Sequence, residues 1–481
     1  MGLALLLLPA RSMTGPETPQ ILFPHNARMP PLQALMAGFL QVAAMFVGCI
    51  TPALIFCAAV DVPDGAQGYL LSMALLTAGL GTFLQARRLG PIGSGLLSVN
   101  GTSFAYVTLV VTAGQQGGIA LACGMALAAV PVQFVLAFFL PFLSRVISPL
   151  VAGTVVMIIG LSLIPAVAGR YLAWDLGEGF TWHTNVLLAG VVLGVLVVAQ
   201  LSRNPYIRTG GPLLALLAGY VIAGVLGLIQ WGAPPTSDRW IMLPQWMPYG
   251  LAFDWTLLLP FAIVYLISSL EAIGDLSATA HLSGMQTGTP AFWKRLRGGI
   301  FSDAITSTLA ALVNIFPTAT FSQNNGVIQM TGVGARQVGY YVAGILVLCA
   351  LLPQTSYLFG LIPRPVLGAV MLMLFGLVFT AGLRMVLSTP LGTRELTVLA
   401  LSLGAAFSIP SQPEFIAQLP AWMGSVLESS VATGGLVVVV LNLLLLTPWR
   451  HAATQDKIVV PGGEPSQGPM VARGTEIGLE R

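Results

Sequence analysis

Residues 320–328 read Thr-Phe-Ser-Gln-Asn-Asn-Gly-Val-Ile, a polar, glycine-containing stretch inside apolar surroundings. A second stretch of this kind, residues 93–103, reads Gly-Ser-Gly-Leu-Leu-Ser-Val-Asn-Gly-Thr-Ser. Both place Asn and Gly in the middle of a predicted membrane span, where helix propensity and hydropathy oppose them. Non-helical backbone is tolerated at membrane depth only where it is buried in protein or lines a cavity. We therefore expect two broken spans whose half-helices present free N–H groups to a ligand at the midplane. The alternative is that Gly and Asn serve close helix packing.

The rest of the 481-residue chain has the composition of a membrane protein. It is 56% hydrophobic and 8% charged, whereas a soluble domain carries about 25% charged residues. This excludes a soluble protein and predicts an all-α polytopic membrane protein. The net charge of +3 is too small to indicate nucleic-acid binding. Neither a disulfide framework nor a metal site is expected, because no His pair has ligand spacing and the cysteines lie in apolar stretches without CxxC spacing: Cys49, Cys57, Cys123 and Cys349.

Apolar segments separated by short loops predict fourteen spans. They cover residues 32–59, 66–86, 92–113, 118–142, 146–168, 183–201, 212–230, 255–283, 298–316, 322–335, 338–356, 365–383, 395–410 and 426–448. Residues 322–335 are too few to cross alone as a helix. Residues 1–31 and 449–481 are predicted to be cytoplasmic segments at the two ends.

The basic residues support an even number of spans. With the N-terminus placed inside, 17 of the 20 Lys and Arg residues fall on one face, and the other face holds only Arg170, Arg239 and Arg364. Cytoplasmic loops are enriched in Lys and Arg, so we expect a multi-pass protein of the inner (plasma) membrane with both termini cytoplasmic. Because seven is odd, two seven-span halves would be inverted relative to each other, which is a transporter architecture.

Three carboxylates lie within the predicted spans. Glu271 and Asp275 are separated by one helical turn and share a face, and Asp303 lies early in the next span. A charge at mid-bilayer costs roughly 2.5 to 3.5 kcal/mol on insertion scales. No Lys or Arg is predicted at this depth, so we expect at least one of these acids to gain and lose a proton as its access alternates between the two sides. For Asp275 and Asp303, bonding to nearby backbone or to Ser and Thr is the alternative.

Three amides follow one another before Gly326: Gln323, Asn324 and Asn325. Together with a carboxylate they match the alternating donors and acceptors on the edge of a heterocycle. The spacing alone does not name the heterocycle.

The run from Gln323 to Arg336 resembles the signature of the nucleobase-ascorbate transporter family. In that signature Gln or Glu, then Asn, any residue and Gly precede a Thr five residues later, and the matching positions are Gln323, Asn324, Gly326 and Thr331. The resemblance extends over residues 32–448, including Glu271, Gly274, Asp275, Asp303 and the stretch from Gly95 to Phe104.

The resemblance implies fourteen spans in two inverted seven-span repeats. Spans one to four (32–142) and eight to eleven (255–356) would form a core domain. Spans five to seven (143–230) and twelve to fourteen (357–448) would form a gate domain that also makes a homodimer. Spans three and ten would each hold a short strand followed by a half-helix.

The resemblance also implies residue roles. Glu271 and Gln323 would hydrogen-bond a purine ring that Phe104 contacts, Asn324 would shape the site, and Asp303 would take part in coupling. We add Asn100, Gln41 and Ser322 to the substrate-binding candidates and Asp275, with Glu271, to the coupling candidates. The structural residues of the motif would be Asn325, Gly326, Thr331, Gly101 and Thr102.

Gln323 followed by Asn324 is similar to the xanthine and uric acid branch, whereas the uracil branch usually has Glu first. We therefore expect a proton-coupled symporter that imports xanthine or uric acid and needs no cofactor beyond the ion gradient, with sodium as the alternative ion. Many bacterial members carry a His where this chain has Gln41. A neutral amide cannot titrate, so any role of that His in proton handling is not carried over.

Other readings of the sequence remain open. A symporter for uracil or another nucleobase would share the fold. An anion carrier should have a basic residue near one of the two breaks, and the sequence has none there. An intramembrane carboxylate enzyme lacks a supporting nucleophile motif, His spacing or phosphate-binding loop.

Overall fold

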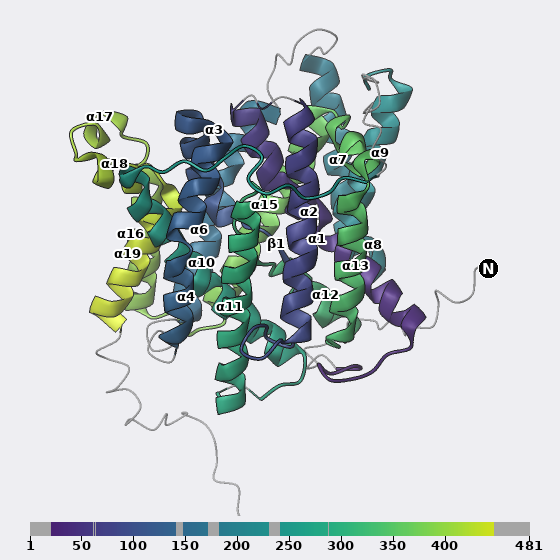
Figure 1. Cartoon of the computed structure of the whole chain (residues 1–481), viewed down its shortest axis with the longest axis horizontal. Helices are drawn as coiled ribbons and strands as arrows, with labels where there is room; N and C mark the ends of the chain where they lie inside the picture. The colour runs from purple at the N-terminus through teal and green to yellow at the C-terminus, as the bar shows by residue number, and fades with distance from the viewer. Residues whose placement is uncertain are drawn as a thin grey trace, which may run out of the picture.

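A computed structural model of the chain describes residues 21–60, 62, 64–140, 148–171, 182–229, 241–286 and 288–446. Most of the predicted N-terminal segment and the whole of 449–481 lie outside these ranges. The first half contains α1 (Pro31–Val60), α2 (Asp64–Arg87), β1 (Asn100–Thr102), the 3-10 turn η2 (Phe104–Tyr106), α3 (Val107–Ala129), α4 (Pro131–Phe138), α6 (Pro149–Tyr171), α7 (Trp182–Leu201), α8 (Pro205–Thr209) and α9 (Gly211–Val225) (Figure 1).

The second half repeats the alternation of long helices with one short strand. It contains α10 (Trp255–Leu282), α11 (Pro290–Leu312), β2 (Thr318–Thr320), α12 (Gln323–Thr331), α13 (Gln337–Leu351), α14 (Pro353–Gly360), α15 (Arg364–Leu387), α16 (Thr393–Ser408), α17 (Pro413–Ile416), α18 (Ala421–Leu427), α19 (Ser430–Leu441) and the π-helical turn η3 (Asn442–Leu446). Each of the fourteen predicted ranges overlaps a helix.

Several helices have the length and hydropathy of membrane spans. Within the described residues, six stretches qualify: Pro31–Val60, Gly65–Arg87, Phe104–Phe138, Trp182–Leu201, Trp255–Leu282 and Arg364–Leu387. A seventh stretch qualifies if Ala421–Leu427 and Ser430–Leu445, which are bent by 90° relative to each other, count as one span. The apolar helices in α6, α9 and α13 are shorter. The chain is an integral membrane protein, and the count of fourteen crossings stays a prediction.

The predicted third and fourth spans meet at a glycine pair. Residues Phe104–Phe138 form one helical run, but Gly117 and Gly118 inside α3 have non-helical backbone angles. Gly118 has φ +67°, a conformation that residues with a Cβ rarely adopt. The break therefore falls where the sequence predicted the boundary between residues 113 and 118.

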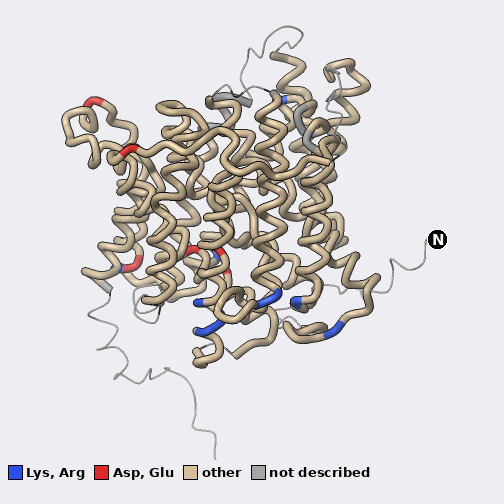
Figure 2. The backbone as a smooth tube through the Cα atoms, viewed as in Figure 1, with Lys and Arg blue, Asp and Glu red and all other residues tan. Residues whose placement is uncertain are grey.

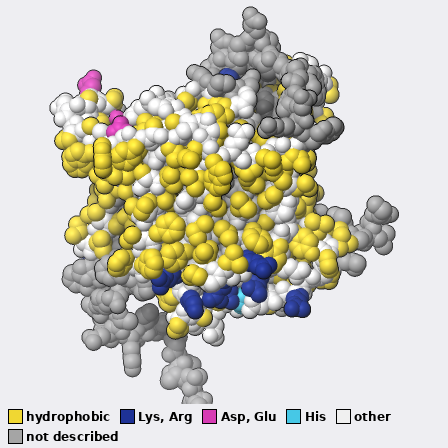
Figure 3. Space-filling model, viewed as in Figure 1, with side chains coloured by type: hydrophobic (Ala, Val, Ile, Leu, Met, Phe, Trp, Pro, Cys, Tyr) yellow, Lys and Arg dark blue, Asp and Glu magenta, His cyan; other side chains and the backbone are white. Residues whose placement is uncertain are grey.

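Charge is segregated along the bundle. Figure 2 shows most Lys and Arg gathered at one end, with Asp and Glu at the opposite end, in the interior and at the lower left margin. Figure 3 shows a broad apolar belt between the two ends. We call the end where α2, α10 and α12 finish and α11 and α13 begin the basic end. There Arg295 donates from Nη1 to the carbonyl oxygens of Ser94 and Gly95, both at 3.1 Å.

Residues before α1 form a strap across the basic end. The backbone N–H of Phe23 donates to Gly332, and that of Gly334 donates back to Phe23. His25 donates its backbone N–H to Ser283 at the end of α10 and accepts from the backbone N–H of Arg336. The strap thus holds the C-terminal ends of α10 and α12 together.

The two polar stretches of the sequence meet in the middle of the bundle. Strands β1 and β2 pair antiparallel, with Asn100 opposite Thr320 and Thr102 opposite Thr318, and Figure 1 places β1 near the centre of the molecule. Each strand is followed by a helix, as predicted. Two short strands can satisfy their backbone groups at this depth because each supplies the other's partners.

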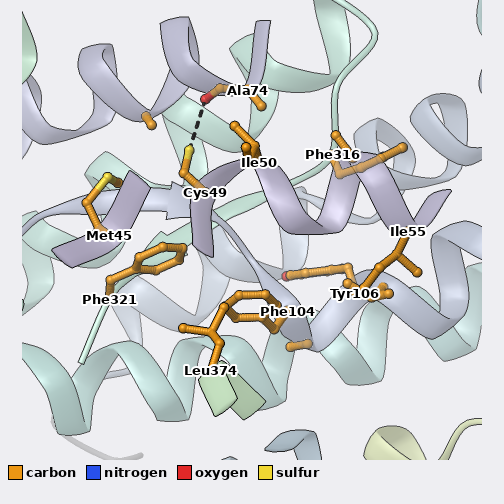
Figure 4. Close-up of a cluster of buried hydrophobic side chains, with 14 of the residues drawn as sticks. Met45, Cys49, Ile50, Ile55, Ala74, Phe104, Tyr106, Phe316, Phe321 and Leu374 are labelled. Atoms are coloured by element: carbon orange, nitrogen blue, oxygen red, sulfur yellow. Dashed lines mark hydrogen bonds between the residues drawn. The ribbon is translucent and has the colours of Figure 1, made fainter. Parts of the chain in front are cut away.

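Aromatic rings pack tightly against this ladder. A Cβ on Gly101 would lie 2.7 Å from the Phe321 ring, so only glycine fits there without a shift. Phe321 stacks on Phe104 with ring centroids 5.8 Å apart, and Phe104 meets Phe375 of α15 edge-on at 5.4 Å. Figure 4 shows Phe104 and Phe321 lying side by side next to Leu374.

Candidate functional site

A small cavity of about 10 Å3 lies beside the strand ladder. Most of its lining comes from the predicted core domain: Ser103, Phe104, Glu271, Ala319, Thr320, Phe321, Ser322 and Gln323. Two apolar residues from the predicted gate domain, Ile159 of α6 and Val378 of α15, close the other side. Its polar groups therefore lie on one wall and its apolar closure on the other.

Glu271 enters the cavity from the middle of α10. This helix starts at a firm N-cap, where the backbone N–H of Thr256 donates to Asp254 Oδ1 at 2.8 Å. Glu271 is partly exposed to the cavity, and the described residues give its carboxylate no hydrogen-bond donor. Its oxygens are free to accept from a ligand. Among the described residues, the cavity lining carries this one carboxylate and no Lys or Arg.

Asp303 of α11 is fully buried behind the ladder rather than in the cavity. Its Oδ1 accepts from Asn100 Nδ2 at 2.6 Å and from Gln85 Nε2 at 2.9 Å. Within the described residues, Asp303 Oδ2 and Asn100 Oδ1 have no hydrogen-bond partner. The acid is therefore tied to the first residue of β1 and keeps one oxygen that could hold a proton.

Asp275 lies on the other side of the same ladder. Thr320 Oγ1 donates to Asp275 Oδ2 at 3.4 Å. The backbone oxygen of Asp275 accepts from Thr279 Oγ1 at 2.8 Å and from Asn325 Nδ2 at 3.3 Å. These contacts to Thr and backbone match the structural alternative raised for Asp275, and they fasten α10 to α12.

Asn324 points away from the cavity and towards α1. Its Nδ2 donates to the Gln41 side-chain oxygen at 2.6 Å and to the Gln41 backbone oxygen at 3.0 Å, and both side chains are buried. Of the substrate-binding candidates, Glu271, Gln323, Ser322 and Phe104 line the cavity, whereas Asn324, Gln41 and Asn100 support it from behind.

Comparison with known proteins identifies the family of this chain. The profile of the permease family Xan_ur_permease matches residues 32–415. The chain belongs to this family, the nucleobase-ascorbate transporters. Xanthine permease XanP of Escherichia coli strain K12 is 38% identical over 448 residues, which cover 90% of this chain and 96% of XanP. Xanthine permease XanQ of the same organism is 35% identical over 448 residues, covering 90% and 95% of the two chains.

A solved structure shares the fold at low sequence identity. The murine anion transporter Slc26a9 in its inward-facing state superposes with a TM-score of 0.60 at 13% identity, covering 88% of this chain and 69% of Slc26a9. The relatives are permeases, so the protein is a transporter and not an enzyme.

The remaining motif residues of the permease shape α12 and the ladder. Thr331 Oγ1 donates to the Val327 backbone oxygen at 2.8 Å, and α12 ends at Gly332, whose φ is +67°. Gly326 lies on an exposed side of α12 with open space around it. Thr102 is buried in β1.

Some site residues gave no usable signal in the sequence of the permease. Gln85 bonds Asp303, but it sits two residues before Arg87 at the end of a span, where a polar residue is ordinary. Ile159 and Val378 are apolar residues within apolar spans. Only the fold shows that they close the cavity.

Proposed function

We propose that the permease is a proton-coupled symporter that imports xanthine, uric acid or both across the inner membrane, with its termini in the cytoplasm. The observation that carries this proposal is one wall of the cavity, where Glu271 lies with the amide of Gln323 and the ring of Phe104. Among the described residues, no donor bonds the Glu271 carboxylate. Its nearest chemical match is a planar purine with several lactam N–H and C=O groups. The names of the relatives, xanthine permeases, agree with it.

Recognition follows from the donors and acceptors available. The Glu271 carboxylate accepts N–H bonds from the base, and the Gln323 amide both donates and accepts on the same edge. The stacked rings of Phe104 and Phe321 give the base an aromatic contact. Arg295 contacts the first break at Ser94 and Gly95, contrary to the expectation that no basic residue lies near either break. It is not among the described residues that line the cavity, and these include no Lys or Arg, so the cavity favours a base that binds in its uncharged form over an anion.

Binding requires the two walls to separate. A volume of about 10 Å3 is near the smallest that holds one water, so a purine enters only when Ile159 and Val378 withdraw from Glu271. The helices that carry them, α6 and α15, pack with backbones close together at Gly153 and Gly382, where a Cβ on either would lie 2.6 Å from the other's carbonyl oxygen. Packing this close would make α6 and α15 move together as the walls separate.

The need for the two cavity walls to separate supports alternating access between a core domain (32–142 and 255–356) and a gate domain (143–230 and 357–448). In this proposal the two domains together are built from two inverted seven-span repeats. The homodimer would form through the gate domain, where α7 and α9 expose large apolar side chains such as Leu187, Val198 and Val221. The alternative occupant of these faces is lipid.

Coupling would use the acids around the ladder. Asp303 Oδ2 has no partner among the described residues, and a proton there would change the bond that Oδ1 makes to Asn100 on β1. Because Ser103 and Phe104, which directly follow β1, line the cavity, the protonation of Asp303 and the occupancy of the cavity would depend on each other. Glu271 would take part directly as the group that binds the base.

Uptake of radiolabelled xanthine by intact cells tests the proposal. Glu271→Gln should abolish high-affinity uptake at unchanged membrane abundance, and Glu428→Gln, remote from the cavity on α18's C-terminal side, serves as the matched control. Competition by unlabelled purines but not by uracil is expected. Competition by uracil alone would favour the uracil alternative, and wild-type kinetics for Glu271→Gln would remove Glu271 from the site.

A further inference from the structure

A second and larger cavity, of about 330 Å3, lies towards the basic end. Its walls come from the end of α10, the start of α11, the start of α6 and the end of α15. This volume is within the range of small-molecule sites. It is open enough for a purine, whereas the cavity at Glu271 is not.

The two cavities lie on the same seam between the predicted core and gate domains. Along α6 the lining moves from Ile159 to Ala152, and along α15 it moves from Val378 to Met385. Both steps are seven residues, which is about 10 Å of helix. The larger cavity therefore continues the path from the smaller one towards the basic end.

A close contact between a core helix and the gate helices lies in the wall of the larger cavity, about one helical turn from Glu271. Gly274 lies three residues after Glu271 on α10 and faces the gate helices: a Cβ built on it would lie 2.8 Å from Met385 Cε and 3.4 Å from Ala152 Cβ. The backbone of Gly274, on the core side, thus contacts the end of the flexible Met385 side chain, on the gate side. Because Met has three rotatable side-chain bonds, a change of its rotamer would open this contact without a shift of either helix.

The larger cavity offers hydrogen-bond acceptors and an aromatic face. The Ser277 hydroxyl donates to the Ile273 backbone oxygen at 2.6 Å, and the Ser388 hydroxyl donates to the Met385 backbone oxygen at 2.7 Å. Because each hydroxyl proton is already donated to a backbone oxygen, the lone pairs of the hydroxyl oxygen remain available to accept from N–H groups of a ligand. Trp293 supplies a ring for stacking, and none of the described residues that line the cavity is charged.

We propose that this cavity is a second binding site for the transported base, a neutral planar heterocycle with several N–H donors, and that Met385 over Gly274 is the barrier between the two sites. The inference rests on the proposed function. Because the second site lacks a carboxylate, it binds the base more weakly than the Glu271 cavity and independently of the proton, which suits release at the basic end.

Cysteine protection in inside-out vesicles tests the second site. Ser277→Cys is introduced together with Cys349→Ser, because the other cysteines of the described chain, Cys49, Cys57 and Cys123, are buried. The rate of labelling by a membrane-impermeant maleimide is measured with and without xanthine. Thr393→Cys, exposed at the start of α16, is the matched control that xanthine should leave unprotected.

The decisive comparison adds Glu271→Gln, which removes the first site. At a xanthine concentration of twice the dissociation constant of the second site, labelling of Ser277→Cys should slow about threefold. Labelling should slow by the same factor when Glu271→Gln is also present. Protection that vanishes with Glu271→Gln, or that is absent throughout, overturns the second site. Xanthine uptake by the unmodified permease is measured in parallel, so a permease that transports xanthine without protecting Ser277→Cys refutes this inference alone. A permease that transports no xanthine refutes the proposed function.

The barrier has its own test. Met385→Ala should raise the labelling of Ser103→Cys, in the first cavity, from the basic end, whereas Met385→Leu should leave it near the level seen with Met385. Equal labelling in all three backgrounds would exclude Met385 as the barrier.

Discussion

Asp303 and Asn100 are 203 positions apart and share a 2.6 Å hydrogen bond between Oδ1 and Nδ2. Asn100 is also the ladder partner of Thr320, which donates to Asp275. One pair of opposite strand residues therefore connects two buried acids from α11 and α10. The ladder joins the two halves of the chain and carries the polar contacts of both.

The first prediction concerns this connection. Asn100→Ala removes a donor to a buried carboxylate, at a cost of about 1 to 3 kcal/mol, and should change the pH dependence of xanthine uptake as well as its rate. Gln133→Ala, a buried amide on α4, is the control. A pH profile identical to wild type in Asn100→Ala would show that the Asp303 bond plays no part in coupling.

The second prediction concerns the support of α12. Gln41→Leu leaves Asn324 without its 2.6 Å acceptor and should raise the KM for xanthine about fivefold, corresponding to roughly 1 kcal/mol. Gln41→His keeps a ring nitrogen as acceptor and should stay closer to wild type. If Gln41→Leu and Gln41→His behave alike, the contact between α1 and α12 does not position the site.

The third prediction concerns the packing of the ladder. Gly101→Ala places a Cβ 2.7 Å from the Phe321 ring, and overpacking of this kind costs about 1 to 3 kcal/mol. The Tm in detergent should fall, and Phe321→Leu in the same chain should recover part of the loss. Failure of the double variant to recover would place the strain elsewhere.

The fourth prediction concerns the strap before α1. Burial, together with the charges of Arg295 and Arg336, lowers the pKa of His25 below its ordinary value of 6.5. The unfolded chain therefore binds a proton at a higher pH than the folded one, and this group's contribution to stability is lost as the pH falls below 6.5. At higher pH the contribution is complete.

Replacement by an amide isolates this effect. The Tm of wild type should decline more steeply than that of His25→Gln when the pH is lowered from about 8 to about 5. Parallel declines in the two proteins would show that His25 does not titrate against folding.

Sequence reasoning located the polar features of the site and missed its closure. The breaks at residues 93–103 and 320–328 were visible because Asn and Gly are costly in a span, and the structure pairs them as β1 and β2. Glu271 was visible for the same reason. The direction of Asn324, towards Gln41 and not into the cavity, depends on the position of α1, 283 residues earlier in the chain, which local sequence does not encode.

Proton-coupled xanthine transport is tested most directly with the purified permease in proteoliposomes. With an imposed pH gradient, acid outside, xanthine should accumulate inside above its external concentration, and adding xanthine should acidify the interior. Glu271→Gln should do neither. Accumulation that ignores the pH gradient and follows a sodium gradient would contradict the coupling, and proteoliposomes that take up no xanthine under either gradient would contradict the function.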